Sequence, residues 1–294
     1  MQIKEGYVPF REYQTYYRVV GEQRDGQVPL LLLHGGPGST HNYFEAFDEL
    51  AATTGRQIVM YDQLGCGRSS MPDQPELWRA ETWLAELQTV REALGLTNVH
   101  LLGQSWGGML AIMYLCDQHP AGIQSLILAS TLSSAPLWAQ EQHRLIKLMS
   151  PADQAAIAAA EDSGDFTQSD YLAANDRYMQ LHAAGPVTRQ APGYLRRAKR
   201  AGTVAYNAAW GPNEYYPTGT LADYDYTDQL KSITVPTLVT SGTDDLCTPL
   251  VAKTMVDHLP NAQWHLFAHS RHMAFIDETP AYFKLLTNWL NQNE

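Results

Sequence analysis

Short apolar runs alternate with amphipathic stretches over the first 131 residues of the chain. Each run is followed by a glycine loop or by polar residues. Runs this short and this apolar are typical of strands that are buried on both faces of a sheet. The runs are 29–33, 57–62, 99–102 and 125–129.

A helical pattern lies between the second and the third of these runs. Trp83, Leu87, Val90 and Leu94 recur at helical spacing, and Gly95 then supplies a C-terminal stop. Short buried strands that are separated by helices form a mostly parallel sheet with helices on both faces. The pattern therefore predicts the α/β class.

The pattern changes between residues 132 and 232, where strand-like apolar runs are absent. Helical stretches such as 151–161 and 169–182 are present instead. We therefore expect a mainly helical insertion at 132–232.

The strand pattern resumes after this insertion. Apolar runs occur at 236–241 and 263–267, and 280–291 carries apolar residues on one helical face. The predicted sheet is therefore built from two parts of the chain, residues 1–131 and residues 233–294.

The composition is typical of a globular protein, with 45% hydrophobic and 17% charged residues. The 31 acidic and 20 basic residues give a net charge of −11, which disfavours binding to nucleic acid and to anionic membranes. The densest basic cluster is interpreted as a solvated helix face rather than a binding patch. It consists of Arg196, Arg197, Lys199 and Arg200.

Three cysteines, Cys66, Cys116 and Cys247, are scattered along the chain. An odd and scattered set argues against a disulfide framework and favours a reducing compartment. We therefore expect a cytoplasmic protein, and no apolar run is long enough to span a bilayer.

The segment Gly103-Gln-Ser105-Trp-Gly107 joins a strand-like run to an apolar helical stretch. It has the form of a nucleophile elbow, in which small flanking residues let neighbouring backbone pass close to a strained serine. The serine hydroxyl then lies at a helix N-terminus, where the amides and the helix dipole favour developing negative charge. Ser105 is therefore the candidate nucleophile, and a plain structural turn is the alternative.

A nucleophilic serine also needs hydrogen-bond donors that stabilise an oxyanion. The loop His34-Gly-Gly-Pro-Gly38 directly follows the first apolar run and exposes backbone N–H groups. It lacks the Gly-Lys-Ser/Thr end of a phosphate-binding loop. We expect one donor from this loop and a second from Trp106, the residue after the serine. His34 itself is interpreted as a structural loop histidine.

The order Ser, Asp, His along the chain predicts the acid after a late strand and the base after the last strand. Asp244 and Asp245 both follow the run at 236–241. Asp245 lies three residues after Gly242 and four before Pro249, which we take as the usual register of the acid. Asp245 is therefore favoured, with Asp244 as the alternative.

Three histidines near the C-terminus are candidates for the base. His272, in the loop before the last helical pattern, is favoured over His269, and His265 lies within the strand-like run. Their spacing also resembles that of metal ligands. However, the i, i+4 pair falls on a strand pattern, and the sequence has no His-Glu-x-x-His motif. We expect neither a metal nor another cofactor.

Five segments that span nearly the whole chain carry a family resemblance. They are His34-Gly-Gly-Pro-Gly38, Asp62-Gln-x-Gly-x-Gly-x-Ser69, Gly103-Gln-Ser-Trp-Gly-Gly108, Trp210-Gly-Pro-Asn-Glu214 and Gly242-x-x-Asp-x-x-x-Pro249. Together they resemble the proline iminopeptidases (prolyl aminopeptidases) of the lactic-acid-bacterial type. The resemblance implies an α/β-hydrolase fold with a helical cap at 132–232. It also implies that the substrates are peptides with an N-terminal proline.

The resemblance further implies roles for individual residues. The implied catalytic triad is Ser105, Asp245 and His272. The implied oxyanion donors are the amides of Gly36 and Trp106, and Glu214 is the carboxylate implied to bind the α-amino group of the substrate.

Two positions depart from the pattern of many relatives. Leu64 stands where many relatives have an arginine, and Leu246 stands where some have a second amine-binding glutamate. Amine binding therefore depends on Glu214 and on an acid that the sequence does not locate.

Other functions remain open at this point. Because fold and triad do not fix the acyl group, a carboxylesterase of the same fold and a Pro-X dipeptidase are alternatives. A catalytically silent ligand receptor is a third, although the intact Ser, Asp and His set argues against it.

Overall fold

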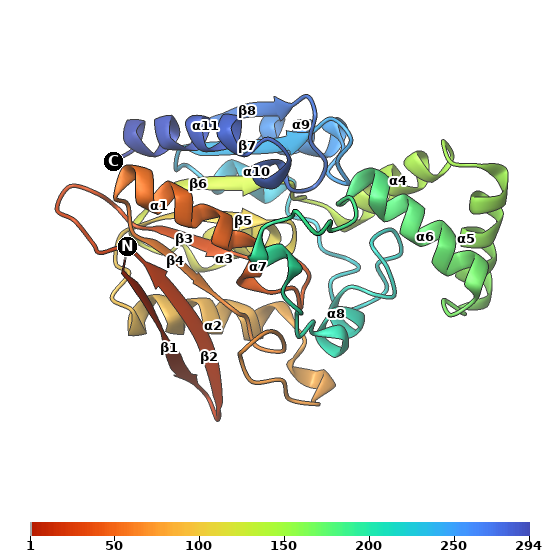
Figure 1. The fold of residues 1–294 in the computed structure, drawn as a ribbon, viewed down its shortest axis with the longest axis horizontal. Coiled ribbons are helices and arrows are strands. Elements are labelled where there is room, and N and C mark those ends of the chain that lie inside the picture. The colour runs from red at the N-terminus through yellow and green to blue at the C-terminus, as the bar shows by residue number, and fades with distance from the viewer. Residues whose placement is uncertain (1) are drawn as a thin grey trace.

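The computed structural model describes residues 2–294, which form one eight-stranded sheet with helices on both faces (Figure 1). The strand order is β1-β2-β4-β3-β5-β6-β7-β8. The β1–β2 and β2–β4 pairs are antiparallel, and the remaining pairs are parallel. The strands are β1 (Ile3–Phe10), β2 (Tyr13–Val20), β3 (Leu30–Leu33), β4 (Ile58–Tyr61), β5 (Val99–Gln104), β6 (Ile123–Ala129), β7 (Thr237–Gly242) and β8 (Ala262–Phe267).

The helices alternate with the strands and also fill the long connection between β6 and β7. Before that connection they are η1 (His41–Phe47), α1 (Asp48–Thr54), η2 (Pro75–Leu77), α2 (Ala80–Ala93) and α3 (Trp106–Gln118). Within it they are α4 (Ala135–Ile146), α5 (Pro151–Ser163), α6 (Ser169–His182), α7 (Gly193–Arg196), α8 (Thr203–Ala209) and η3 (Asp228–Ser232). After it they are α9 (Pro249–His258), α10 (Ala274–Asp277) and α11 (Thr279–Gln292).

Alternate residues of the buried strands pack into two separate cores. In β3, Leu31 and Leu33 pack in a core with side chains of α2, α3 and α9. Leu30 and Leu32 pack in the opposite core, which contains side chains of α1, α10 and α11. All four leucines have 0% exposed surface, which explains why the strand is a continuous apolar run.

The connection between β6 and β7 lies beyond the carboxyl ends of the parallel strands (Figure 1). Helices α5 and α6 pack against each other and lie farthest from the sheet, whereas α7 and α8 lie closer to it. In open α/β sheets, ligands bind at the carboxyl ends of the strands. This arrangement places helical residues opposite the edge of the sheet where a site is expected.

The N-terminal hairpin is a part of the fold that the apolar pattern did not predict. The strands β1 and β2 pair antiparallel from Ile3–Val20 to Phe10–Tyr13, and most residues of β1 are exposed or half-buried. An edge strand with few buried side chains carries too little apolar periodicity to be recognised. Within residues 2–294, no helix combines the length and the apolar character required to cross a membrane.

Candidate active site

Ser105 lies at the junction of β5 and α3, directly before the first residue of the helix. Its backbone angles, φ 55° and ψ −125°, are rare for a residue with a side chain. Glycines on either side permit this turn. A Cβ on Gly103 would overlap the carbonyl oxygen of Gly107, and a Cβ on Gly107 would overlap that of Leu33. The tight packing of β3, β5 and α3 therefore requires glycine at both positions.

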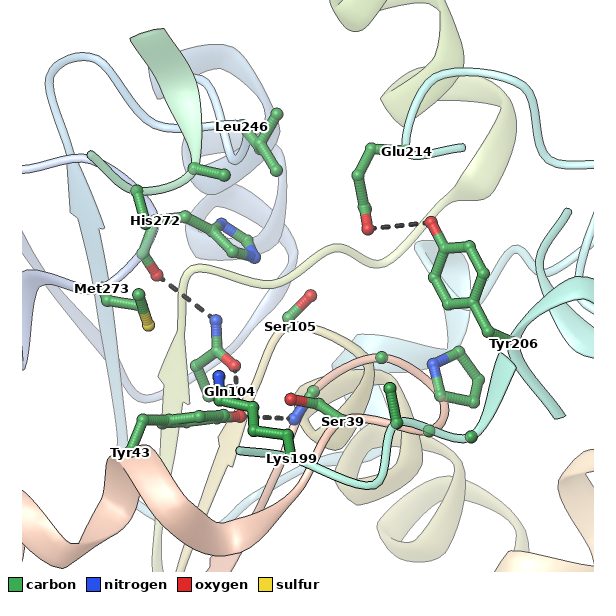
Figure 2. Close-up of a pocket in the computed structure, with 18 of the residues that line it drawn as sticks. Ser39, Tyr43, Gln104, Ser105, Lys199, Tyr206, Glu214, Leu246, His272 and Met273 are labelled. Carbon is green, nitrogen blue, oxygen red and sulfur yellow. Dashed lines mark hydrogen bonds between the residues drawn. The ribbon is translucent and has the colours of Figure 1, made fainter. Parts of the chain in front are cut away.

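The backbone of Ser105 forms hydrogen bonds with the last residue of β6 and with a residue that follows β6. The Ser105 N–H donates to the carbonyl oxygen of Ala129 at 3.0 Å, and the Thr131 hydroxyl donates to that of Ser105 at 2.6 Å. The Ser105 side chain points into the cavity shown in Figure 2. Its position at the N-terminus of α3 favours negative charge beside it.

Asp245 and His272 come together from the loops that follow β7 and β8. Nδ1 of His272 donates to the buried carboxylate of Asp245 at 2.7 Å. The same carboxylate accepts from the Ser130 hydroxyl at 2.6 Å and from the amides of Gly242 and Cys247 at 3.1 Å and 2.9 Å. With the Nδ1 proton fixed on Asp245, the Nε2 lone pair of His272 is left free to accept a proton.

The competing residues lie elsewhere. The side chains of Asp244, His265 and His269 are exposed to solvent. His272 lines the same cavity as Ser105, and both side chains point into it (Figure 2). Across residues 2–294, no three His, Cys, Asp or Glu side chains are grouped so that they could hold a metal ion.

The loop after β3 forms one wall of this cavity. Gly36 adopts φ 117°, a conformation that favours glycine, and a Cβ there would lie 2.5 Å from the amide nitrogen of Gly38. The Gly35 N–H donates to the Tyr43 hydroxyl at 2.7 Å. In the described part of the chain, the amides of Gly36 and Trp106 donate to no other protein group. Both therefore remain available to a ligand.

Gln63 connects the two segments that carry these free amides. Its side-chain Nε2 donates to the carbonyl oxygen of His34, at the start of the glycine loop, at 3.0 Å. Its Oε1 accepts from Nε1 of Trp106, at the start of α3, at 2.7 Å. All three side chains are buried. One amide side chain thus fixes the spacing between the loop and the helix.

The same network defines the state of His34. Burial lowers the pKa of His34 to about 4, so its imidazole is neutral near pH 7. Nε2 of His34 accepts from the backbone N–H of Gln63 at 3.0 Å. The proton of the neutral imidazole is therefore on Nδ1, which donates it to the Gly35 carbonyl oxygen at 2.9 Å. These contacts give His34 a structural place in the loop.

Glu214 reaches the cavity from the segment after α8. Its side chain accepts a hydrogen bond from the Tyr206 hydroxyl at 2.9 Å (Figure 2), and its carbonyl oxygen accepts from Trp138 Nε1 at 2.8 Å. Desolvation raises the pKa of the Glu214 carboxyl, whereas the nearby His272 and the bond from Tyr206 act in the opposite direction. A carboxylate in such surroundings gains stability from a bound cation.

The backbone around Glu214 is fixed by its neighbours. The Asn213 side chain accepts from the Tyr215 N–H at 3.0 Å and donates to the Tyr171 hydroxyl of α6 at 2.9 Å. Gly211 adopts φ 148°, and a Cβ there would lie 2.6 Å from the Tyr216 carbonyl oxygen. The backbone conformation at Gly211 and the hydrogen bonds of Asn213 therefore account for these two residues of the motif.

The cavity has a volume of about 380 Å³, within the range of small-molecule sites. Leu246, the residue directly after Asp245, is buried and lines this cavity. An apolar side chain therefore stands at the position where a second amine-binding glutamate was considered. Leu64 is also buried, and its N–H donates to both carboxylate oxygens of Glu86, at 2.9 Å and 3.0 Å.

Other residues of the site were not among those selected from the sequence. Gln63 lies within the Asp62–Ser69 segment, but the sequence of that segment does not reveal its hydrogen-bond partners. Tyr43, Lys199 and Tyr206 line the cavity from three separate segments, and no sequence spacing connects them.

Comparison with known proteins identifies close relatives. The family model described as the alpha/beta hydrolase fold matches residues 28–279. A protein named proline iminopeptidase from Levilactobacillus brevis is 70% identical over 290 residues, covering 99% of this chain and 97% of the relative. Another of that name, from Lactiplantibacillus plantarum, is 69% identical over 283 residues, covering 96% and 99% of the two chains.

Two solved structures share the fold over almost the full length. The crystal structure of VinJ superimposes with a TM-score of 0.91 at 32% identity, covering 99% of both chains. The crystal structure of a proline iminopeptidase from Mycobacterium smegmatis has a TM-score of 0.88 at 30% identity, covering 99% of this chain and 98% of the other. These matches confirm the expected fold class.

Proposed function

The chain belongs to the proline iminopeptidase family of α/β hydrolases, and on that premise we propose that it is a serine aminopeptidase that releases proline from the N-terminus of peptides. Ser105, His272 and Asp245 are proposed as its catalytic triad, with the amides of Gly36 and Trp106 as oxyanion donors.

In the proposed reaction, the Ser105 hydroxyl attacks the carbonyl carbon of the N-terminal residue while His272 Nε2 takes the hydroxyl proton. Asp245 keeps the other imidazole proton on Nδ1 and stabilises the cation that forms. The two amides donate to the oxyanion of the tetrahedral intermediate. His272 then returns the proton to the leaving amine. Water attacks the acyl-enzyme by the same route and releases proline.

The observation that carries this proposal is the position of Glu214. Its carboxylate and the Ser105 hydroxyl lie in one cavity of about 380 Å³ (Figure 2). An N-terminal amine has a pKa of about 8 and is largely cationic at neutral pH. A carboxylate that holds this amine would place the first carbonyl of the peptide, rather than a later one, next to Ser105. An ester substrate without an amine offers no cation for this carboxylate to bind.

Replacing Glu214 by glutamine tests the proposed substrate. A charge-assisted hydrogen bond to the amine is worth about 1.5–3 kcal/mol, so Glu214→Gln should lower kcat/KM for a proline arylamide about 10- to 150-fold. Hydrolysis of a short acyl ester without an amine should change less than about 3-fold, because Ser105 and the oxyanion donors are untouched.

Two controls frame this result. Ser105→Ala should lower kcat on both substrates by about 10⁴-fold or more. Glu161→Gln removes another carboxylate of the same insertion, one that pairs with His143 outside the cavity, and should affect neither substrate. Equal losses on both substrates for Glu214→Gln would indicate a structural role. An unchanged Glu214→Gln variant would favour the carboxylesterase alternative.

The proposal also covers the role of the helical insertion and the location of the protein. We propose that residues 132–232 act as a cap that limits access to Ser105 from the amine side, which would explain a preference for the first residue. We also propose a cytoplasmic location. It is supported by three cysteines that are buried and unpaired in the described chain.

A further inference from the structure

The basic cluster at 196–200 is divided between different environments. Arg197 donates to both carboxylate oxygens of Glu45, at 2.7 Å and 3.1 Å, and so ties the segment after α7 to η1. Lys199 instead lines the active-site cavity. Among residues 2–294, no carboxylate lies within ion-pair distance of the Lys199 ammonium. All four basic residues are exposed, as expected, but only Arg196 lies on a helix, and Lys199 also lines the cavity.

The cavity carries opposite charges on its two sides. Of the described residues that line it, Glu214 is the only carboxylate, and Lys199 is the only lysine or arginine. Figure 2 shows the two side chains on opposite sides of Ser105. They do not pair with each other, so each charge is free to meet a ligand. A cavity of this kind is complementary to a molecule with separated positive and negative ends.

The position of Lys199 corresponds to the leaving group of the proposed reaction. Its ammonium lies 5.8 Å from the ring centroid of Tyr43. The Tyr43 hydroxyl in turn bonds to Gln104, the residue before Ser105, at 2.8 Å. When the amine is held at Glu214 and the carbonyl at Ser105, the rest of the peptide extends away from Glu214, toward Lys199. One further residue extends the peptide by about 3.5 Å. A flexible lysine side chain can reach a carboxylate at the end of that residue.

The surroundings of Lys199 favour an anion. Desolvation lowers the pKa of its ammonium, and no protein carboxylate compensates for this loss of water. A bound carboxylate would supply the missing charge. The side chain also keeps solvent access, so a ligand can reach it.

We propose that Lys199 binds the terminal carboxylate of the leaving amino acid, and that the cavity therefore prefers dipeptides of the form Pro-X with a free C-terminus. This inference rests on the proposed function, because it takes the amine to be at Glu214. It adds a second charged contact, on the other side of the scissile bond, that selects the leaving residue by its negative charge.

The test compares one dipeptide with and without its negative charge. For Pro-Ala, Lys199→Met should lower kcat/KM about 5- to 20-fold, because a partly exposed charged contact is lost. For Pro-Ala-NH₂, which lacks the carboxylate, the same variant should differ from the unchanged chain by less than 2-fold. Lys199→Arg keeps the charge and should retain most of the preference for Pro-Ala.

A matched variant controls for the general loss of positive charge. Arg200→Met removes the same charge from the adjacent residue, which does not line the cavity, and should leave the ratio of the two substrates unchanged. Equal ratios for Lys199→Met and the unchanged chain would overturn the proposal, as would an equal shift in Arg200→Met.

Binding measurements separate this inference from the proposed activity. Calorimetric titration of Pro-Ala and Pro-Ala-NH₂ into Ser105→Ala, with and without Lys199→Met, reports on the carboxylate contact without turnover. Loss of affinity for Pro-Ala alone supports the role of Lys199, and equal affinities contradict it. Failure of the unchanged chain to cleave both Pro-Ala and Pro-Ala-NH₂ would instead count against the aminopeptidase proposal.

Discussion

Each carboxylate oxygen of Asp245 accepts two hydrogen bonds, which fixes the plane of the group against His272. An asparagine at this position has only one accepting oxygen and cannot satisfy all four donors. We expect Asp245→Asn to lower kcat for a proline arylamide by about 10³-fold or more, because the imidazole loses control of its tautomer. Steady-state kinetics would measure the loss, and circular dichroism would show whether the fold persists.

The neighbouring aspartate provides the matched control. Asp244 is exposed, so Asp244→Asn should retain kcat within about 3-fold. A larger loss for Asp244→Asn than for Asp245→Asn would transfer the role of the acid to Asp244 and contradict the proposed triad.

Individual residues were predictable from sequence where a local pattern constrains them. Ser105 could be selected because two nearby glycines mark a turn whose geometry excludes other side chains. Gln63 and Lys199 could not be selected in this way. Their roles depend on partners 29 or more positions away, such as His34 for Gln63, and only the folded chain brings these groups together.

At the scale of elements, Gln63 joins the loop after β3 to the start of α3. Gln63→Met removes both side-chain bonds but keeps a similar volume. The oxyanion exists only in the transition state and in the intermediates near it, so poorer alignment of its donors should lower kcat about 10-fold and change KM less than about 3-fold. Kinetics with a proline arylamide would separate these two parameters.

Ligand binding distinguishes alignment of the oxyanion donors from a purely structural role of Gln63. Binding of a boronic-acid analogue of proline, which becomes tetrahedral on Ser105, should weaken with kcat, whereas binding of proline itself should not. Gln74→Met, an exposed change in the same connection between β4 and α2, should alter neither. Parallel weakening of both ligands would indicate that the cavity as a whole is disturbed.

The elements themselves were predictable to different extents. The parallel strands β3 to β7 are buried on both faces, and this burial requires the continuous apolar runs that the sequence displays. The β1–β2 hairpin obeys no such requirement, because β1 lies at the edge of the sheet and is largely exposed. The helices α7 and α8 are only 4 and 7 residues long, too short to establish a helical period.

At the scale of the whole molecule, one buried carboxylate connects three parts of the core. Glu86 of α2 accepts from the Thr15 hydroxyl of β2 at 2.5 Å and from the Leu64 amide after β4 at 2.9 Å. Desolvation nevertheless raises the pKa of Glu86 to about 7. Its hydrogen bonds only partly offset the cost of burying a charge.

This raised pKa makes the stability of the fold depend on pH. An unfolded chain releases the Glu86 proton near pH 4.3, whereas the folded chain keeps it until about pH 7. Between these values the folded state binds more protons, so the free energy of unfolding falls as pH rises, and it levels off above pH 7. The stabilising contribution of the protonated carboxyl is therefore complete below about pH 4 and lost above about pH 7.

Glu86→Gln removes this titration and keeps an oxygen for Leu64 and an amide for Thr15. Between pH 5 and pH 8, the unchanged chain should lose about 2 to 3 kcal/mol of unfolding free energy relative to this variant. Urea unfolding at the two pH values measures the difference, in which the titration of all other groups cancels. Glu81→Gln, an exposed change on the same helix, should track the unchanged chain. A constant difference between the unchanged chain and Glu86→Gln would mean that Glu86 titrates alike in the folded and unfolded states.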